Sequence, residues 1–273
     1  MADEKWIFKA RLYPHFDHAI LDSREATALV TDPQKVTSHA FHPFLEYDRK
    51  NRKFAKHLEK LQYLESGEDL SDFDVNKLRS IKYASHSDAQ IFSYYRFLLS
   101  QQYEKRLHQF SLNDNIIAYR KVPISDGSKK GKCNIHFAKE VFDEITKKKN
   151  VIAITLDISN FFDSLDHAFL QKKWYELLKK DKLPPDHEAV FKAITNYSVV
   201  NHAEGYEKLG LIQIKKGRRH FLHCPIFIAK HKKMLCSKKE YRQLIVANGL
   251  VKKNDYGKKS VPQGIPQGSP ITP

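Results

Sequence analysis

Apolar residues recur at helical spacing in five stretches of the chain. The spacing predicts helices over residues 51–64, 87–110, 134–149, 164–181 and 186–197. Ser87 and Gln90 form a capping-box pattern at the start of the longest of these helices. Ser237 and Glu240 repeat that pattern and predict a further helix.

Two other kinds of pattern predict strands. Residues 77–83 alternate basic and apolar side chains, as a half-buried strand does, and residues 205–231 alternate again. The six apolar or β-branched residues of 151–156 predict a short, buried strand that follows the last of the 134–149 helix. Residues 1–50 show no clear period, and we expect them to be irregular.

Composition makes the chain a basic, globular protein. Its 273 residues are 41% hydrophobic and 29% charged, which is enough apolar material for a sizeable core and is unlike a disordered chain. The net charge of +15 favours a polyanionic partner, and the commonest polyanion in a cell is nucleic acid. A basic surface without a specific partner is the alternative.

Cysteine content and the first residues indicate the compartment. Three cysteines cannot all pair, and none lies in a CxxC motif, which is typical of a reducing cytosol. The charged N-terminal stretch lacks the apolar core of a signal peptide, and no run approaches the ~20 apolar residues of a membrane span. We therefore expect a cytoplasmic protein without a membrane partner.

An acid stands where the 151–156 strand ends. Asp157 follows six apolar residues, and a carboxylate in such a place is costly unless a positive group meets it. A divalent cation such as Mg²⁺ is one such partner, because it prefers oxygen ligands. The alternative is that Asp157 only forms a turn or caps a helix.

Two motifs in the same order resemble bacterial reverse transcriptases, the branch of retrons, group II intron proteins and defence-associated enzymes. The first is the strand, Asp157, Phe161-Phe162, Asp163 and Leu165-Asp166-His167, which resembles the first catalytic motif of the family. The second is the stretch 264–273, GIPQGSPITP, which resembles the P-Q-G-x-x-x-S-P loop. The pair makes the resemblance specific.

The resemblance implies an α+β fold, the right-hand polymerase arrangement. It comprises mostly helical fingers and an incomplete palm with antiparallel strands, and the thumb is absent. The domains expected are an N-terminal extension with the start of the fingers (1–74), fingers (75–150) and palm (151–273). A basic insert around 205–235 lengthens the interval between the two motifs.

The resemblance also assigns roles to individual residues. Asp157 would be the catalytic metal ligand, assisted by the carbonyl of Ile158, and the implied cofactor is two Mg²⁺ ions, with Mn²⁺ possible. Phe162 would be a steric gate that selects dNTP over NTP, although ordinary core packing is the alternative. Gln267 and Gly268 would contact the incoming nucleotide, where glycine permits close backbone approach.

Three basic residues complete the candidate site. Arg79, with Lys77 second, lies on the strand that would hold the triphosphate, and a solvated strand face is the alternative. Arg120 and Lys121 lie in an A-Y-R-K string that resembles the segment along the template, where cations bind phosphate without reading sequence.

One departure from the family limits the activity expected. The aromatic-x-Asp-Asp hairpin of the family is missing, since the chain contains no Asp-Asp pair. We expect an N-terminal fragment that is inactive by itself, from an RNA-directed DNA polymerase of an antiviral defence or retron-like system. Its partners would be an RNA template, a nucleic-acid primer and dNTPs. The alternatives are a non-catalytic basic RNA- or DNA-binding module and a template-independent polymerase of the same fold.

Overall fold

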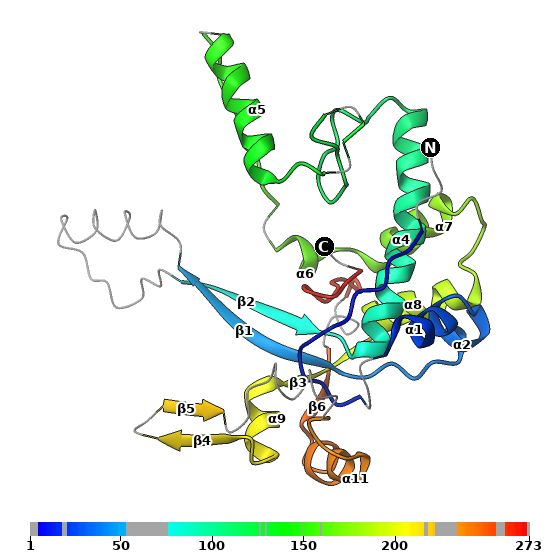
Figure 1. Cartoon of the computed structure of the whole chain (residues 1–273), viewed down its shortest axis with the longest axis vertical. Coiled ribbons are helices and arrows are strands. Elements are labelled where there is room, and N and C mark those ends of the chain that lie inside the picture. Colours follow the sequence, from blue (N-terminus) through cyan, green and yellow to red (C-terminus); the bar gives the residue numbers. More distant parts are fainter. Residues whose placement is uncertain are drawn as a thin grey trace, which may run out of the picture. The chain divides into compact units, whose positions relative to one another are not determined.

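The computed structural model describes most of the chain (Figure 1). The described residues are 5–17, 21–52, 76–125, 127–128, 130–148, 150–158, 160–215, 218–221, 234–254 and 260–271. The fold is mixed α+β. It divides into two compact units, one of residues 1–97 with 162–273 and the other of residues 98–161. The predicted helix after Asn51 falls almost wholly outside the described residues.

A small mixed sheet lies in the larger unit. Its strand order is β2-β1-β3-β6. Strand β1 pairs antiparallel with β2 and parallel with β3, and β3 pairs antiparallel with β6. Within the predicted palm (151–273), β3 pairs antiparallel with β6, as predicted, and the parallel pair joins β3 to β1, which lies outside that range. The predicted 77–83 strand is confirmed as β2. The bounds are Phe44–Arg52 (β1), Asn76–Tyr83 (β2), Ser198–Asn201 (β3) and Val251–Lys253 (β6).

Helices precede β1 in sequence and lie between the later strands. The predicted long helix is confirmed as α4. The helices are α1 (Ser23–Val30), α2 (Pro33–Thr37), α4 (His86–Gln109), α5 (Asn134–Lys147), α6 (Phe161–Ser164), α7 (His167–Leu177), α8 (Pro185–Thr195), α9 (His202–Lys208), α11 (Lys238–Glu240) and the π-helical η1 (Tyr241–Val246). A separate hairpin joins β4 (Ile212–Lys215) to β5 (Arg218–Phe221).

Side-chain caps set where these helices begin. The predicted capping box of Ser237 and Glu240 is confirmed at α11. The predicted box of Ser87 and Gln90 is wrong, because α4 begins earlier and the Gln90 amide donates to the Lys9 carbonyl instead. Helix α7 is capped by Asp166, whose carboxylate accepts from the Phe169 amide at 2.7 Å.

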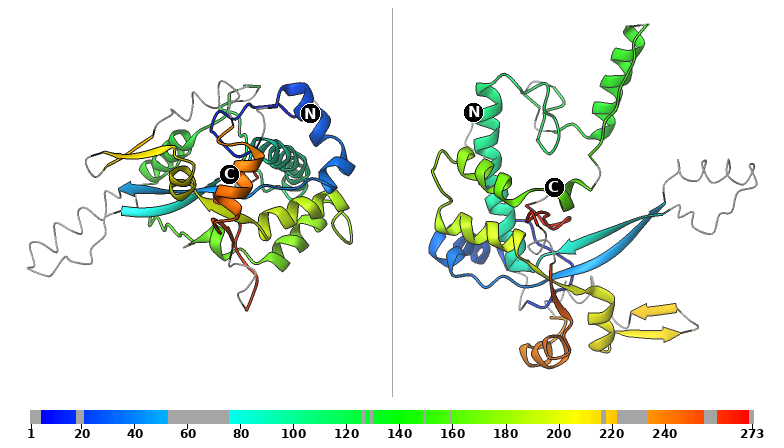
Figure 2. Two further views of the ribbon diagram at one scale, coloured as in Figure 1. Left: turned by 90° about the horizontal axis from the view of Figure 1, so that it is seen from below. Right: turned by 180° about the vertical axis from the view of Figure 1, so that it is seen from behind.

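The sheet is covered on both faces at the start of β1. Successive strand residues point to opposite faces, so Phe44 and Leu45 of β1 enter different cores. Phe44 stacks on Phe92 of α4, with ring centroids 5.9 Å apart. Leu45 joins a cluster with Tyr206 of α9 and residues of the 234–246 segment, namely Leu235, Cys236 and Ile245. The views in Figure 2 show α4 and α9 on either side of β1.

The predicted buried strand at 151–156 is wrong. Residues 151–158 form neither helix nor strand, and Ile152, Ile154 and Leu156 are 91%, 80% and 90% exposed. An extended segment becomes a buried strand only when neighbours hydrogen-bond to it and cover it. Among the described residues no strand pairs with this segment, so its apolar composition is not matched by burial.

Candidate nucleotide-binding loop and its surroundings

The loop of residues 262–269 is tied by backbone hydrogen bonds to the segment that precedes α7. The Ile265 amide donates to the Phe162 carbonyl and the Gly264 amide to the Leu165 carbonyl, each at 2.8 Å. The His167 amide donates to the Pro262 carbonyl at 2.9 Å, and the His167 ring bonds the Gly264 carbonyl at 2.7 Å. Two segments far apart in the sequence are therefore held together in the way a sheet ladder holds strands.

The same loop seals part of the free edge of β2. An edge strand leaves alternate backbone N–H groups unpaired. The Lys82 amide donates to the Gln267 carbonyl at 2.9 Å and is thereby satisfied. The loop consequently brings Phe162, Gln267 and Gly268 to the strand that carries Arg79.

Gly268 cannot be replaced without cost in this arrangement. Its φ is +97°, a backbone conformation that L side chains rarely adopt. A Cβ atom at this position would lie 2.7 Å from Cγ2 of Ile81 on β2. The glycine is therefore required both by the turn and by the close approach of the loop to the strand.

A buried charge pair supports β2 from the other sheet face. The Lys82 side chain is 8% exposed, and its Nζ lies 3.3 Å from Oε1 of Glu46 on β1. The Ser80 hydroxyl donates to the same Glu46 oxygen at 2.6 Å. This network was not evident from the sequence, because the contact of Lys82 with Glu46 depends on the β1–β2 register.

Arg79 lies on the exposed face of β2, opposite a second arginine. The register pairs Arg79 with Arg49 of β1, and both residues are exposed. Neither makes an ion pair with another described residue. Like charges at directly opposed positions are destabilising, so this face is suited to a bound anion. Lys77 lies on the same strand, but its side chain is outside the described part.

The remaining predicted residues belong to the unit of residues 98–161. Asp157 and Ile158 lie in the exposed 151–158 segment. Arg120 is held by Glu104, with 2.8 Å and 2.7 Å between their paired atoms, and by the Asn113 carbonyl at 2.8 Å. Arg120 therefore has a structural explanation of its own, while Lys121 is exposed. Their nucleic-acid contacts stay a prediction.

The described residues do not form a metal centre. No group of three or more His, Cys, Asp or Glu side chains among them is arranged to hold a metal ion. Asp157 and the Ile158 carbonyl by themselves do not fit the two ions that the resemblance implies, because each ion needs several oxygen ligands.

A buried histidine–aspartate network, missed at the sequence level, fixes the first turn of α4. His86 Nδ1 lies 2.6 Å from Asp17, and its Nε2 lies 2.7 Å from the Tyr13 carbonyl. Carboxylate and carbonyl oxygens only accept, so both ring nitrogens carry protons and His86 is cationic. Burial opposes that charge, but the hydrogen bond to Asp17, the negative charge of Asp17 and the hydrogen bond to the Tyr13 carbonyl together raise the pKa of His86.

Asp88 forms the second half of this network. It accepts from His39 Nε2 at 2.6 Å and from the His42 amide at 2.9 Å. Burial opposes its ionisation, but these histidines hold the pKa of Asp88 far below its usual range. His15 lies beside the network, fully buried, and burial lowers its pKa to about 4. Neither ring nitrogen of His15 has a hydrogen-bond partner among the described residues.

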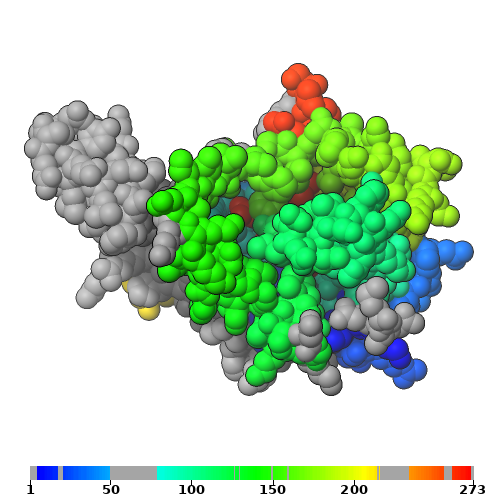
Figure 3. All heavy atoms as spheres, turned by 90° about the horizontal axis from the view of Figure 1, so that it is seen from above, coloured from blue at the N-terminus to red at the C-terminus, as the bar shows by residue number. Residues whose placement is uncertain are grey.

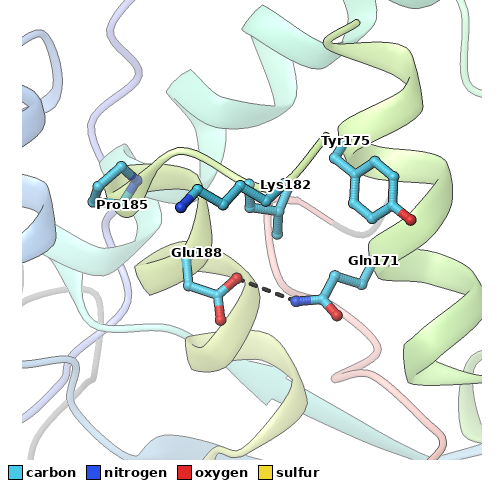
Figure 4. Close-up of a pocket in the computed structure, with 6 residues that line it drawn as sticks. Gln171, Tyr175, Lys182, Pro185 and Glu188 are labelled. Atoms are coloured by element: carbon cyan, nitrogen blue, oxygen red, sulfur yellow. Dashed lines mark hydrogen bonds between the residues drawn. The ribbon is translucent and has the colours of Figure 1, made fainter. Parts of the chain in front are cut away.

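A shallow pocket lies apart from these residues, between α7 and α8. Its volume is about 460 Å³, and in Figure 4 a hydrogen bond of 3.2 Å joins Gln171 to Glu188 across it. The yellow-green surface of these helices is exposed in Figure 3. None of the predicted site residues lines this pocket. Its lining residues are Gln171, Tyr175, Lys182, Leu183, Pro185 and Glu188.

Comparisons with known proteins add no family. No protein-family model matches the chain, and no curated protein sequence matches it. Within the described parts of the chain, no helix combines the length and the apolar character needed to cross a bilayer.

Proposed function

We propose that the chain carries the fingers and part of the palm of a reverse transcriptase, an RNA-directed DNA polymerase of a bacterial antiviral-defence or retron-like system. The observation that carries the proposal is the loop of residues 262–269. It joins the backbone of Phe162 and the edge of β2, and these are the segments to which the resemblance assigns nucleotide binding. Two motifs far apart in sequence are thus neighbours in space.

Different residues of the site would contact different parts of a dNTP. Gln267 and Gly268 would face the incoming nucleotide at the loop, and Phe162 would exclude a 2′-hydroxyl. Arg79 and Arg49, exposed and unpaired with acids among the described residues, would hold the triphosphate, since guanidinium groups bind phosphate oxygens bidentately. A template strand and a primer would be the nucleic-acid partners, with Arg120 and Lys121 near the template.

The metal requirement is also part of the proposal. Bound Mg²⁺ would supply activation of the primer hydroxyl and charge neutralisation on the triphosphate. Asp157 and the Ile158 carbonyl would be two of the ligands. Because the sequence contains no Asp-Asp pair, the proposal needs further carboxylates beyond Asp157.

Primer extension tests the proposal. The full-length product of the gene should add dNTPs to a DNA primer on an RNA template when Mg²⁺ is present, whereas residues 1–273 by themselves should not. Asp157→Ala should abolish this activity, and Asp181→Ala, which changes another exposed aspartate, should not. Phe162→Ala should admit rNTPs. Unchanged extension in Asp157→Ala would refute the role of that carboxylate.

A non-catalytic RNA- or DNA-binding module is the second candidate. The observation in its favour is that Asp157 is exposed and that no three-ligand metal group occurs among the described residues. This candidate predicts nucleic-acid binding that is indifferent to Mg²⁺ and to Asp157→Ala, without extension of any primer. Extension in the absence of a template would instead identify a template-independent polymerase.

A further inference from the structure

Positive charge is concentrated in one fifth of the chain. Residues 202–254, called the basic lobe below, contain 13 Lys and Arg against 3 Glu and no Asp, a net charge of +10. The other 220 residues contain 34 basic and 29 acidic residues, a net charge of +5. Between Glu207 and Glu240 the sequence has ten basic residues and no acid. A surface selected only for solubility mixes both signs, and this one does not.

Apolar residues of the basic lobe are buried in a core that they share with β1 and β3, so the lobe packs through these side chains and not through its cations. Tyr206 of α9 and Ile245 of η1 are almost fully buried and pack in one cluster with Val200 of β3. The described Lys and Arg side chains are all exposed. They are Lys208, Lys215, Lys238, Lys239, Arg242, Lys252 and Lys253.

The acids of the basic lobe do little to neutralise these cations. Glu240 is engaged in the capping box, where it accepts from the Ser237 amide at 2.7 Å and the Ser237 hydroxyl at 2.8 Å. One ion pair is found among the described residues of the lobe, in which Lys252 Nζ lies 3.7 Å from Glu204 Oε2. Most of the described cations of the lobe therefore face solvent without an acidic partner among the described residues.

The β4–β5 hairpin adds like charges in opposed positions. Its register pairs Lys215 with Arg218, and it projects beside α9 in Figures 1 and 2. Like charges at directly opposed positions destabilise a hairpin.

The described surface favours phosphate groups over lipid or bases. Amphipathic segments that insert into a membrane surface carry large apolar side chains beside their cations, and base stacking in single strands uses exposed aromatic rings. Among the described residues of the basic lobe, Val246 is the one large apolar side chain that is exposed, and none of the described aromatic rings is exposed. Cations alone contact phosphates, without reading sequence.

We propose that the basic lobe binds the phosphate backbone of nucleic acid, without sequence preference, at a site separate from the 262–269 loop. The inference goes beyond the proposed polymerase function, because it requires neither Asp157 nor a metal. The inference applies equally to a polymerase that binds its template through the lobe and to a protein that binds nucleic acid without catalysis.

A quadruple neutralising variant tests the basic lobe. Lys208, Lys215, Lys238 and Lys239 are changed to Gln in the full chain, and the control changes Lys172, Lys173, Lys179 and Lys180, which are also exposed, to Gln. Binding of a fluorescein-labelled, single-stranded RNA of mixed sequence is followed by anisotropy between about 50 and 200 mM salt. The slope of log K against log salt should fall by about 2–3 in the lobe variant, at ~0.7 for each phosphate that the protein no longer neutralises.

The control should keep the wild-type slope, although both variants lose the same net charge. Equal slopes in the two variants would overturn the proposal. Sedimentation of the wild-type protein with phosphatidylserine vesicles, without binding of the RNA, would also overturn it. A variant with Arg in place of Lys at the same four lobe positions keeps the charge and should keep the wild-type slope. It controls for misfolding caused by substitution at these positions. Weaker RNA binding by this variant would contradict an electrostatic contact.

Discussion

At the scale of single residues, the 262–269 loop depends on Gly268. Two requirements meet at this residue, a positive φ of +97° and the approach of its Cα to the Ile81 side chain. The first requirement is common to several glycines of the chain. The second is particular to Gly268, because the loop must lie close enough for the Gln267 carbonyl to reach the Lys82 amide.

Gly268→Ala should lower the free energy of unfolding by about 1–3 kcal/mol, because it adds backbone strain to a steric clash with β2. The matched control is Gly210→Ala. Gly210 also has a positive φ, +69°, but nothing lies within 4 Å of where its Cβ would be. Urea unfolding followed by circular dichroism measures both variants. The control should lose less stability than Gly268→Ala, and equal losses would contradict the close approach of loop and strand.

At the scale of elements, α4 is held by the histidine–aspartate network at its first turn. The network joins residues from three segments, at 13–17, 39–42 and 85–88. His15, which lies beside this network, should make the stability of the fold depend on pH. Its pKa is about 4 in the folded protein against an ordinary 6.5, so between these values the unfolded chain binds a proton that the folded chain does not.

Folding stability attributable to His15 should therefore decrease as the pH falls through 6.5 towards 4. The expected loss between pH 7.5 and pH 5 is about 2 kcal/mol, at ~1.36 kcal/mol for each unit of pKa difference. His15→Leu should remove this loss, and His108→Leu, which changes an exposed histidine, should retain it. The comparison is made by urea unfolding of the three proteins at both pH values. A wild-type protein whose pH dependence matched that of His15→Leu would contradict the assignment.

Elements with strong local signals were predictable from sequence, and elements set by distant partners were not. Helix α4 and the α11 cap follow from spacing and capping residues. Strand β1, with the sequence FLEYDRKNR, has little apolar alternation beyond Phe44 and Leu45, and it becomes a strand because β2 and β3 pair with it. The run at 151–156 shows the reverse case. Its β-branched residues favour a strand, but no described segment pairs with it.

The candidate site follows the same division. The residue types in the 262–269 loop and at Phe162 could be recognised as motifs. Their partners could not, because the contact of Gln267 with Lys82 and the pairing of Arg79 with Arg49 depend on the tertiary arrangement. The histidine–aspartate network left no periodic signal, since its members come from three separate segments of the chain.

At the scale of the whole molecule, two properties act against each other. The net charge of +15 keeps copies of the chain apart. The exposed side chains of Ile152, Ile154 and Leu156 favour association, because a bare β-branched segment can pair with another copy of itself. Which property dominates should depend on salt, because the repulsion between solvent-exposed charges is screened within about 3 Å at 1 M salt.

Light scattering should therefore rise as the salt concentration is raised towards about 1 M, where the Debye length is ~3 Å. Ile154→Lys should suppress the rise by placing a charge within the segment. Val246→Lys adds the same charge at a smaller exposed apolar side chain outside the segment and serves as the control. If both substitutions suppress scattering equally, net charge and not the 151–158 segment governs association.

The exposed 151–158 segment also changes what Asp157 contributes to the protein. Lys147 and Lys148 precede the apolar run and Asp157 ends it, an arrangement in which flanking charges act as gatekeepers against cross-β stacking. Asp157→Ala would remove a gatekeeper together with the proposed metal ligand, so an inactive preparation could be an aggregated one. Asp157→Lys keeps a charge at the position and cannot ligate a cation. A polymerase that depends on the carboxylate should lose activity in both variants and remain dispersed in the second.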